Sequence, residues 1–85
     1  MTKEKLLAKI RNNQKNIKFR EFVLLIESFG FSYVRTNGSH TIYAHPRVVE
    51  LVNIQNVNGQ AKPYQIKGFL NLVDAYHLSQ EVTND

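Results

Sequence analysis

The Asn37-Gly38 dipeptide is the feature that most constrains the fold of this chain, because it separates two runs of strand-like composition. Residues 31–36 precede it, residues 39–44 follow it, and Pro46 closes the second run. Asn-Gly readily takes the two positive-φ positions of a type I′ turn. The sequence therefore predicts a β-hairpin with a two-residue loop, and a loop of that length fixes the strand register.

The predicted register decides which side chains share a face of the sheet. It places Arg35 opposite His40 and Tyr33 opposite Ile42. Alternation along the strands then gives one face, the more apolar of the two, to Phe31, Tyr33, Arg35, His40, Ile42 and Ala44. The other face receives Ser32, Val34, Thr36, Thr41, Tyr43 and His45. We expect His40 at the rim of the apolar face, beside a cation and neither deeply buried nor fully exposed.

Two helices are predicted before the hairpin. Thr2 is a suitable N-cap for a short helix that ends near Asn12. The second helix is predicted by apolar residues at three-four spacing, which form one stripe: Phe19, Phe22, Val23, Ile26 and Phe29. Gly30 follows as a left-handed stop.

A third strand and a last helix are predicted after the hairpin. Residues 50–55 have strand composition, and Pro63 suits the first turn of a helix whose apolar stripe includes Phe69. Gly68 lies inside that helix, where glycine costs about 1 kcal/mol relative to alanine. We therefore expect close packing around Gly68.

The predicted order is helix, helix, three-stranded antiparallel meander, helix. Helices on one face of an antiparallel sheet make a two-layer α+β domain. The α-β-β-β-α core has the element order of a double-stranded-RNA-binding domain. We expect an N-terminal helical extension over residues 1–17, an RNA-binding domain over residues 18–78 and a polar tail over residues 79–85.

Composition limits the chemistry and the location of this 85-residue chain. It has no cysteine, so it can form neither a disulfide nor a thiolate metal site. The only acid near the hairpin is Glu50, and we expect neither a metal nor another cofactor. Apolar runs are too short to span a bilayer and no signal-peptide pattern opens the chain. We expect a cytoplasmic protein with no membrane partner.

The net charge of +4 is unevenly distributed. Residues 1–20 hold seven of the eleven basic side chains against one acid. This suggests a polyanionic partner at one end, although a solvated lysine-rich helix explains the same pattern. Double-stranded-RNA-binding domains reach RNA with the first core helix, the hairpin loop and the start of the last helix. Here those places carry basic or polar residues: Lys18, Arg20, Ser39, His40, Lys62 and Lys67.

The Gly38-Ser39-His40 triplet, preceded by E-S-F-G-F at the helix stop and followed by His45-Pro46, resembles the HicA family of bacterial mRNA interferase toxins. The resemblance covers residues 18–77. It implies a ribonuclease that cuts mRNA, with the family histidine at His40, held inactive by a HicB-like antitoxin. The chain departs from common members in the turn before the last helix and in residues 1–17.

The resemblance and the histidine chemistry suggest the same activity. Cleavage of RNA by internal attack needs a base for the 2′-hydroxyl and an acid for the leaving oxygen, and histidine serves either role near neutral pH. We predict a metal-independent endoribonuclease with His40 as catalytic residue and Arg35, Ser39, Lys62 and Lys67 as RNA contacts. The alternatives are a non-catalytic RNA-binding module on the same fold and a protein-interaction domain. His45 is interpreted as a turn residue or a second proton carrier.

Overall fold

Helices and strands follow one another in the order that the sequence predicts. The computed structural model describes residues 1–82. Within them the elements are α1 (Lys3–Asn12), α2 (Phe19–Ser28), β1 (Ser32–Asn37), β2 (His40–His45), β3 (Val48–Gln55) and α3 (Pro63–Ala75). The predicted α+β class is confirmed. The third strand begins at Val48, two residues before the predicted start.

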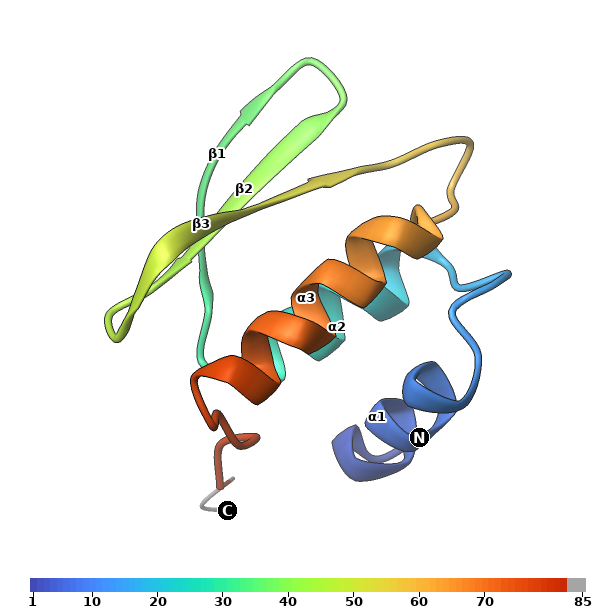
Figure 1. Ribbon diagram of the computed structural model, residues 1–85. Helices are drawn as coiled ribbons and strands as arrows, with labels where there is room; N and C mark the ends of the chain where they lie inside the picture. Colours follow the sequence, from blue (N-terminus) through green and yellow to red (C-terminus); the bar gives the residue numbers. More distant parts are fainter. Residues whose placement is uncertain (83–85) are drawn as a thin grey trace.

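The three strands form one antiparallel sheet in the order β1-β2-β3, so β2 is central. Figure 1 shows α2 and α3 together on one face of this sheet. The other face carries no helix from the described part of the chain. The sheet therefore has one face in the core and one open face, as the two-layer prediction requires.

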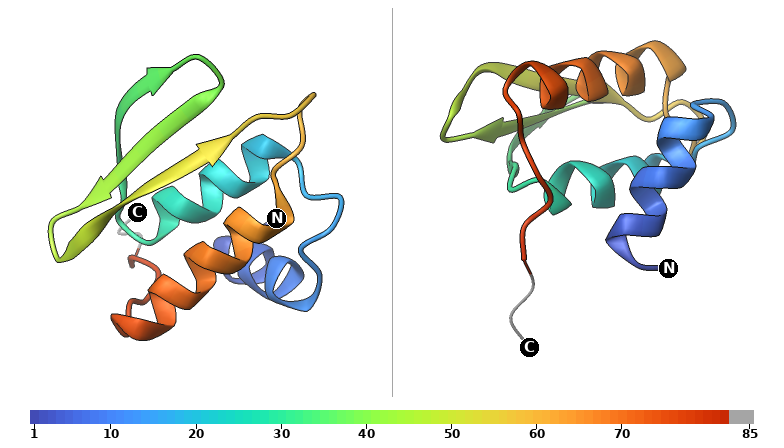
Figure 2. Two further views of the ribbon diagram at one scale, coloured as in Figure 1. Left: turned by 45° about the horizontal axis from the view of Figure 1, so that its top comes forward. Right: turned by 60° about the horizontal axis from the view of Figure 1, so that its bottom comes forward.

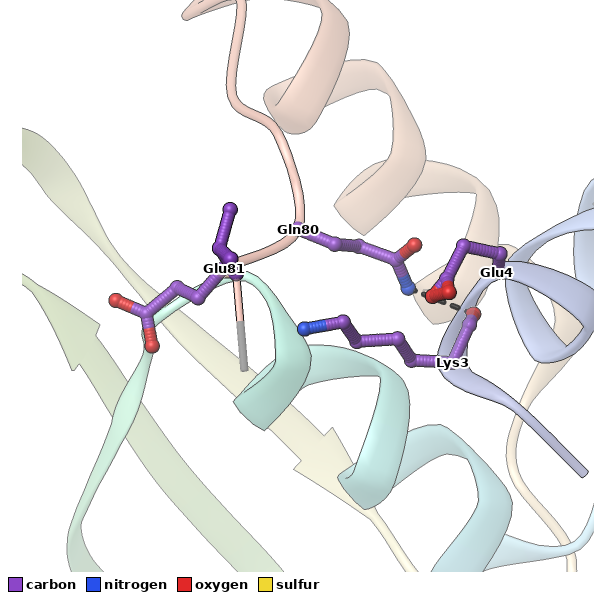
Figure 3. Close-up of a pocket in the computed structure, with 5 residues that line it drawn as sticks. Lys3, Glu4, Gln80 and Glu81 are labelled. Atoms are coloured by element: carbon purple, nitrogen blue, oxygen red, sulfur yellow. Dashed lines mark hydrogen bonds between the residues drawn. The ribbon is translucent and has the colours of Figure 1, made fainter. Parts of the chain in front are cut away.

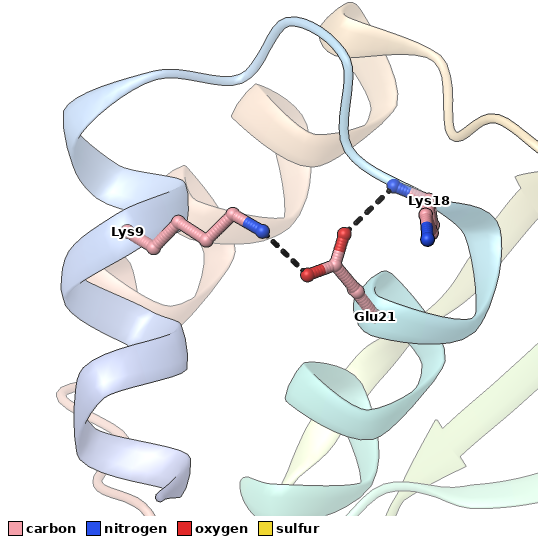
Figure 4. Close-up of polar contacts among 3 residues, drawn as sticks. All are labelled: Lys9, Lys18 and Glu21. Atoms are coloured by element: carbon pink, nitrogen blue, oxygen red, sulfur yellow. Dashed lines mark hydrogen bonds and ion pairs between the residues drawn. The ribbon is translucent and has the colours of Figure 1, made fainter. Parts of the chain in front are cut away.

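Local signals explain where α1 and α2 begin and end. The Thr2 hydroxyl accepts a hydrogen bond from the backbone N–H of Lys5 at 3.2 Å and so caps α1. At the start of α2, the Glu21 carboxylate accepts from the backbone N–H of Lys18 at 3.0 Å (Figure 4). Gly30 has φ of +91° and ends α2, because a left-handed residue stops a helix and glycine takes that conformation without strain.

The core is centred on Phe69 of α3. Its ring packs edge-to-face against Phe22 of α2 and against Phe29, the C-cap of that helix, at centroid distances of 5.8 Å, and against Phe31 at 5.4 Å. Edge-to-face pairs at this separation add to the free energy of burying the rings. This aromatic cluster joins the two core helices and the start of the hairpin.

The hairpin loop differs from the predicted type I′ turn. The structure pairs Asn37 with His40, which leaves Gly38-Ser39 as the two-residue loop. Of the residues around this loop, only Gly38 has positive φ, at +61°. Glycine at the first central position is what a type II′ turn requires, and this turn also matches the strand twist. The predicted register is therefore wrong: Arg35 lies opposite Ile42, and a bulge at Val34 separates it from the next pair.

The core-facing side of the hairpin is also the opposite of the predicted one. Tyr43 pairs with Val52 and Thr41 with Ile54, and both of these β3 residues belong to the main core. Side chains that oppose each other across antiparallel strands share a face, so Thr41 and Tyr43 face the helices. His40 consequently lies on the open face. Strand β3 determines which face of the hairpin meets the helices, because the buried residues of β3 pack against those helices.

The N-terminal helix and the described part of the tail lie next to each other (Figure 2). The Gln80 amide donates to the backbone oxygen of Lys3 at 2.8 Å and to Oγ of Ser28 at 3.0 Å. Lys3 and Glu4 at the start of α1 and residues 80–82 together line a cavity of about 530 Å³ (Figure 3). The rest of the predicted polar tail, residues 83–85, lies outside the described residues. No helix in residues 1–82 is long and apolar enough to cross a membrane.

Candidate functional site

His40 is the first residue of β2 and follows the hairpin loop directly. Its ring is half-buried, and Nδ1 lies 2.9 Å from Oδ1 of Asn53 on β3. An amide oxygen only accepts hydrogen bonds, so a neutral His40 carries its proton on Nδ1 and keeps the lone pair on Nε2. Within the described chain, Nε2 forms no hydrogen bond. The arrangement leaves a basic nitrogen available to a ligand.

Strand register explains why Asn53 and Arg35 lie near His40. Ile42 pairs with Asn53 on one side and with Arg35 on the other, while His40 pairs with Gln55. His40 and Ile42 are two residues apart, so both neighbours are diagonal to His40 on the open face. Arg35 was predicted directly opposite His40, and the structure moves it two residues along β2, opposite Ile42. It forms no ion pair with any residue that the structure describes.

The start of α3 reaches the same end of the sheet through a glutamine. Oε1 of Gln65 accepts from the backbone N–H of Gln55 at 2.8 Å, and Nε2 of Gln65 lies 3.3 Å from Oε1 of Gln55. Because Gln55 pairs with His40, this contact places the N-terminus of α3 beside the histidine. Lys62 is the N-cap residue of α3, and its Nζ lies 5.7 Å from the centroid of the Tyr64 ring.

The remaining predicted site residues lie around this centre at different places. Ser39 is exposed in the hairpin loop, and its backbone oxygen accepts from the N–H of Asn56 at 3.4 Å. Lys67 is exposed one turn into α3. His45 is not part of the site: its ring lies 5.0 Å from Phe31, and Nδ1 accepts from the backbone N–H of Arg47 at 3.0 Å. This contact agrees with the interpretation of His45 as a turn residue.

A groove of about 290 Å³ runs between β3 and α3 and is lined by Glu50, Leu51, Val52, Asn53, Tyr64, Gln65, Gly68, Phe69 and Leu72. Asn53 belongs both to this groove and to the hydrogen bond with His40. Near the other end, the Tyr76 hydroxyl donates to the Glu50 carboxylate at 2.6 Å. This bond lowers the pKa of Glu50 and raises the pKa of Tyr76. Glu50 is therefore ionised at neutral pH and does not serve as a proton donor there.

A family model described as the HicA toxin of bacterial toxin-antitoxin systems matches residues 19–74 of the chain. The chain belongs to the HicA toxin family. It is thus a toxin by family, and the family implies an antitoxin partner. No curated protein and no solved structure shows a significant match. The segment that matches the HicA model contains His40, Asn53 and the whole groove, and it begins after α1.

Sequence reasoning missed two residues of the candidate site, Asn53 and Tyr64. Asn53 is a polar residue between Val52 and Ile54, so alternation alone would have placed it on the open face. Its link to His40 needed the register, which depends on the turn type. Tyr64 is at the second position of a helix, and no local pattern distinguishes an exposed tyrosine there from a packed one.

Proposed function

We propose that this HicA-family chain is an endoribonuclease that cleaves mRNA without a metal ion, with His40 as the proton-transfer residue. The observation that carries the proposal is the hydrogen bond from His40 Nδ1 to Asn53 Oδ1, which leaves Nε2 without a partner in the described chain. A base oriented by a second side chain, in reach of solvent, is what acid-base catalysis needs.

The proposed reaction is internal attack within the RNA chain. Nε2 of His40 takes the proton of a 2′-hydroxyl, and the bond from that oxygen to phosphorus forms as the bond from phosphorus to the 5′-oxygen breaks. The leaving 5′-oxygen takes a proton from solvent water, and the His40 imidazolium afterwards releases its proton to solvent. The products are a 2′,3′-cyclic phosphate and a 5′-hydroxyl end. Asn53 supports the step because its oxygen accepts from Nδ1–H and stabilises the imidazolium that forms.

The distribution of metal-coordinating side chains favours a mechanism without a metal ion. Residues 1–82 contain no group of three or more His, Cys, Asp or Glu side chains placed to hold an ion. Divalent ions such as Mg²⁺ and Ca²⁺ bind through carboxylates and other oxygen ligands. The positive charge for the developing phosphorane is proposed to come from Arg35 and Lys62.

The substrate contacts follow from the placement of the cations. Arg35 lies on the open face with His40, and Lys62 and Lys67 lie at the start of α3, where a helix N-terminus also favours anions. Ser39 is exposed at the loop and donates to phosphate. We propose single-stranded mRNA as substrate, because unpaired strands can fold around a hairpin tip, and a HicB-like protein as the antitoxin.

The decisive experiment compares two histidine substitutions. His40→Ala should lower the cleavage rate by about 10²–10⁴-fold, the usual contribution of a general acid or base, without changing the thermal unfolding midpoint by more than a few degrees. The matched control is His77→Asn, since His77 has φ of +53° after α3 and asparagine tolerates that conformation. The control should cleave normally.

Two results would count against this function. Undiminished cleavage by well-folded His40→Ala protein would remove the histidine from the mechanism. Binding of RNA by the unaltered protein with no cleavage at any pH would identify a non-catalytic RNA-binding module. Cleavage should also persist in excess chelator, and loss of activity that magnesium restores would show that a metal takes part.

A further inference from the structure

The groove between β3 and α3 carries an exposed aromatic ring and includes Asn53, the hydrogen-bond partner of the proposed catalytic histidine. We propose that this groove binds one nucleobase of the RNA substrate, stacked on Tyr64, next to the phosphate that is cleaved. The inference rests on the proposed ribonuclease function and adds a base-binding subsite to it.

The position of the Tyr64 ring suits it to stack on a nucleobase. Its side chain is 66 % exposed although it lies in a groove, and it is absent from the hydrophobic core. The bases of single-stranded nucleic acids stack on exposed aromatic rings of this kind, and every base offers a face for it. Lys62, with Nζ near the same ring, can hold the phosphate of the stacked nucleotide.

Gly68 supplies an independent argument for an open groove. It lies inside α3 with φ outside the left-handed region, so the backbone does not require glycine there. A Cβ atom at Gly68 would meet no atom within 4 Å, so packing does not require it either, contrary to the expectation from sequence. Glycine weakens a helix interior, yet this one faces the groove. A ligand that approaches the helix backbone closely explains it.

The charges of the groove favour a base over a phosphate. Glu50 at the rim is ionised, because the hydrogen bond from Tyr76 holds the pKa of that carboxyl below its usual range. A carboxylate repels phosphate but accepts hydrogen bonds from base N–H groups. The buried residues beneath the groove, Val52 and Phe69, offer apolar contact to a flat ring. Asn53 accepts from His40 through Oδ1, and its Nδ2 group, which has no partner in the described chain, provides a hydrogen-bond donor for the base edge. Both ends of the Gln65 amide are already bonded to Gln55.

Size and position identify which part of the substrate enters. A volume of about 290 Å³ is at the lower limit of ligand pockets, which suits a single base rather than a longer segment. Asn53 lines the groove and bonds to His40, so a base seated there lies beside the attacking nucleotide. The substrate class is therefore single-stranded RNA that can present one unpaired base at the cleavage position.

The first test is a coupling experiment between protein and RNA. Binding of a short, fully 2′-O-methylated single-stranded RNA is measured for the unaltered protein and for Tyr64→Ala, with an abasic nucleotide scanned along the strand. Methylation blocks internal attack, so binding is measured without cleavage. Tyr64→Ala should weaken binding roughly 10-fold. At one position of the strand, the abasic substitution should weaken binding to the unaltered protein by a similar factor. The same substitution should not weaken binding to Tyr64→Ala, because both changes remove the same contact.

The matched variants are Tyr64→Phe and Tyr33→Ala. Tyr64→Phe keeps the ring and should retain the coupling. Tyr33 is similarly exposed at 57 %, but it lies on β1 at the other edge of the sheet. Its replacement should leave the pattern of abasic effects unchanged. If no position couples to Tyr64, or if Tyr33 shows the same coupling, the proposal is overturned.

The second test separates stability from binding at Gly68. Gly68→Ala should raise the unfolding midpoint by about 4 °C, because alanine favours the helix and its Cβ meets no neighbour. It should nevertheless weaken RNA binding, and the bulkier Gly68→Leu should abolish the coupling to Tyr64. A variant that is more stable and still binds RNA with full coupling would contradict the groove as a base site.

These readouts distinguish the subsite from the ribonuclease function. Cleavage of unmodified RNA tests the function alone, and the coupling measured on methylated RNA tests the groove alone. If Tyr64 and Gly68 variants lose antitoxin binding while their RNA coupling is unchanged, the groove is a protein contact and the base proposal fails.

Discussion

The two ends of the molecule use positive charge in different ways. At the N-terminal end, Lys9 forms an ion pair with Glu21 at 2.6 Å, and Arg11 forms one with Asp74 at 2.8 Å. At the hairpin end, Arg35 forms no ion pair with any described residue, and Nζ of Lys62 faces an aromatic ring. Charge density is highest in the N-terminal sequence, yet two of its cations are already paired inside the fold, whereas Arg35 and Lys62 form no ion pair with any described residue.

This contrast separates a structural region from a proposed functional one. Helix α1 contributes Leu6 and Ile10 to the core and is attached to both α2 and α3 by ion pairs. The hairpin end has an exposed loop, an open sheet face and a groove. Two of the N-terminal basic residues therefore serve to attach α1 to the rest of the domain. This explanation differs from both earlier interpretations of the charge, a binding site for a polyanion and a solvated lysine-rich helix. Each prediction below acts on one end and should leave the other unaffected.

The largest expected effect is on the stability of the N-terminal end. Ile10 is fully buried in the core, so Ile10→Ala should lower the free energy of unfolding by about 2–5 kcal/mol. Chemical denaturation measures this loss. Cleavage per folded molecule should not change, because Ile10 lies on α1 and not near His40. Leu24→Ala is the matched control, since Leu24 is 57 % exposed on α2 and should cost far less. Loss of cleavage by folded Ile10→Ala protein would show that the two ends are coupled.

Local signals predicted the helices well because their determinants lie within a few residues. The N-cap at Thr2, the stop at Gly30 and the start at Pro63 were all correct. His40 is half-buried beside the loop as predicted, but it lies on the open face and not on the predicted apolar one. The element order and the α+β class follow from these signals.

Sheet register and facing were wrong because they depend on distant residues. The turn could form one residue later around Gly38, and nothing in the Asn37-Gly38 pair itself decides between the two loops. The face that meets the helices was fixed by Val52 and Ile54 on β3, more than ten residues from the loop. The contact between Asn53 and His40 and the groove could not be predicted without knowing both the strand register and the face that meets the helices. The expected packing at Gly68 failed for a related reason, because the space beside a helix is a tertiary property.

The second prediction concerns where an antitoxin binds. If it inhibits by covering the hairpin end, amide hydrogen exchange should slow at residues 35–40 and 60–67 when the co-encoded partner is added. At a partner concentration of 100 times Kd, the added stability is about 2.7 kcal/mol. Residues 3–12 should change less. Protection of α1 alone, with cleavage still blocked, would instead mean inhibition from the other end of the molecule.

A third, smaller effect distinguishes the cations of the two ends. Lys62→Ala should weaken RNA binding and reduce the slope of log affinity against log salt by about 0.7, the change expected for one phosphate contact on a single strand. The sequence preference of cleavage should stay the same. Lys9→Ala removes an equal charge that Glu21 already pairs, so its salt slope should match that of the unaltered protein. Equal slopes for all three proteins would make Lys62 a solvated residue.

The smallest expected effect is the loss of stability when the Lys9–Glu21 ion pair is removed. This effect can be recognised by its dependence on pH. The hydrogen bond from Lys9 and that from the Lys18 backbone N–H lower the pKa of Glu21 in the folded protein (Figure 4). A carboxyl whose folded pKa lies below its unfolded value stabilises the protein above the unfolded pKa, and this contribution is lost as the pH falls through the folded pKa. Glu21→Gln keeps an acceptor for Lys18 and removes only the charge. It should cost about 0.5–1 kcal/mol at neutral pH, as partly exposed pairs do, and nothing in acid. Denaturation of both proteins across this pH range measures the difference. A cost that persisted in acid would mean that Glu21 acts through packing, and the charge of Glu21 would then contribute nothing to the attachment of α1 to α2.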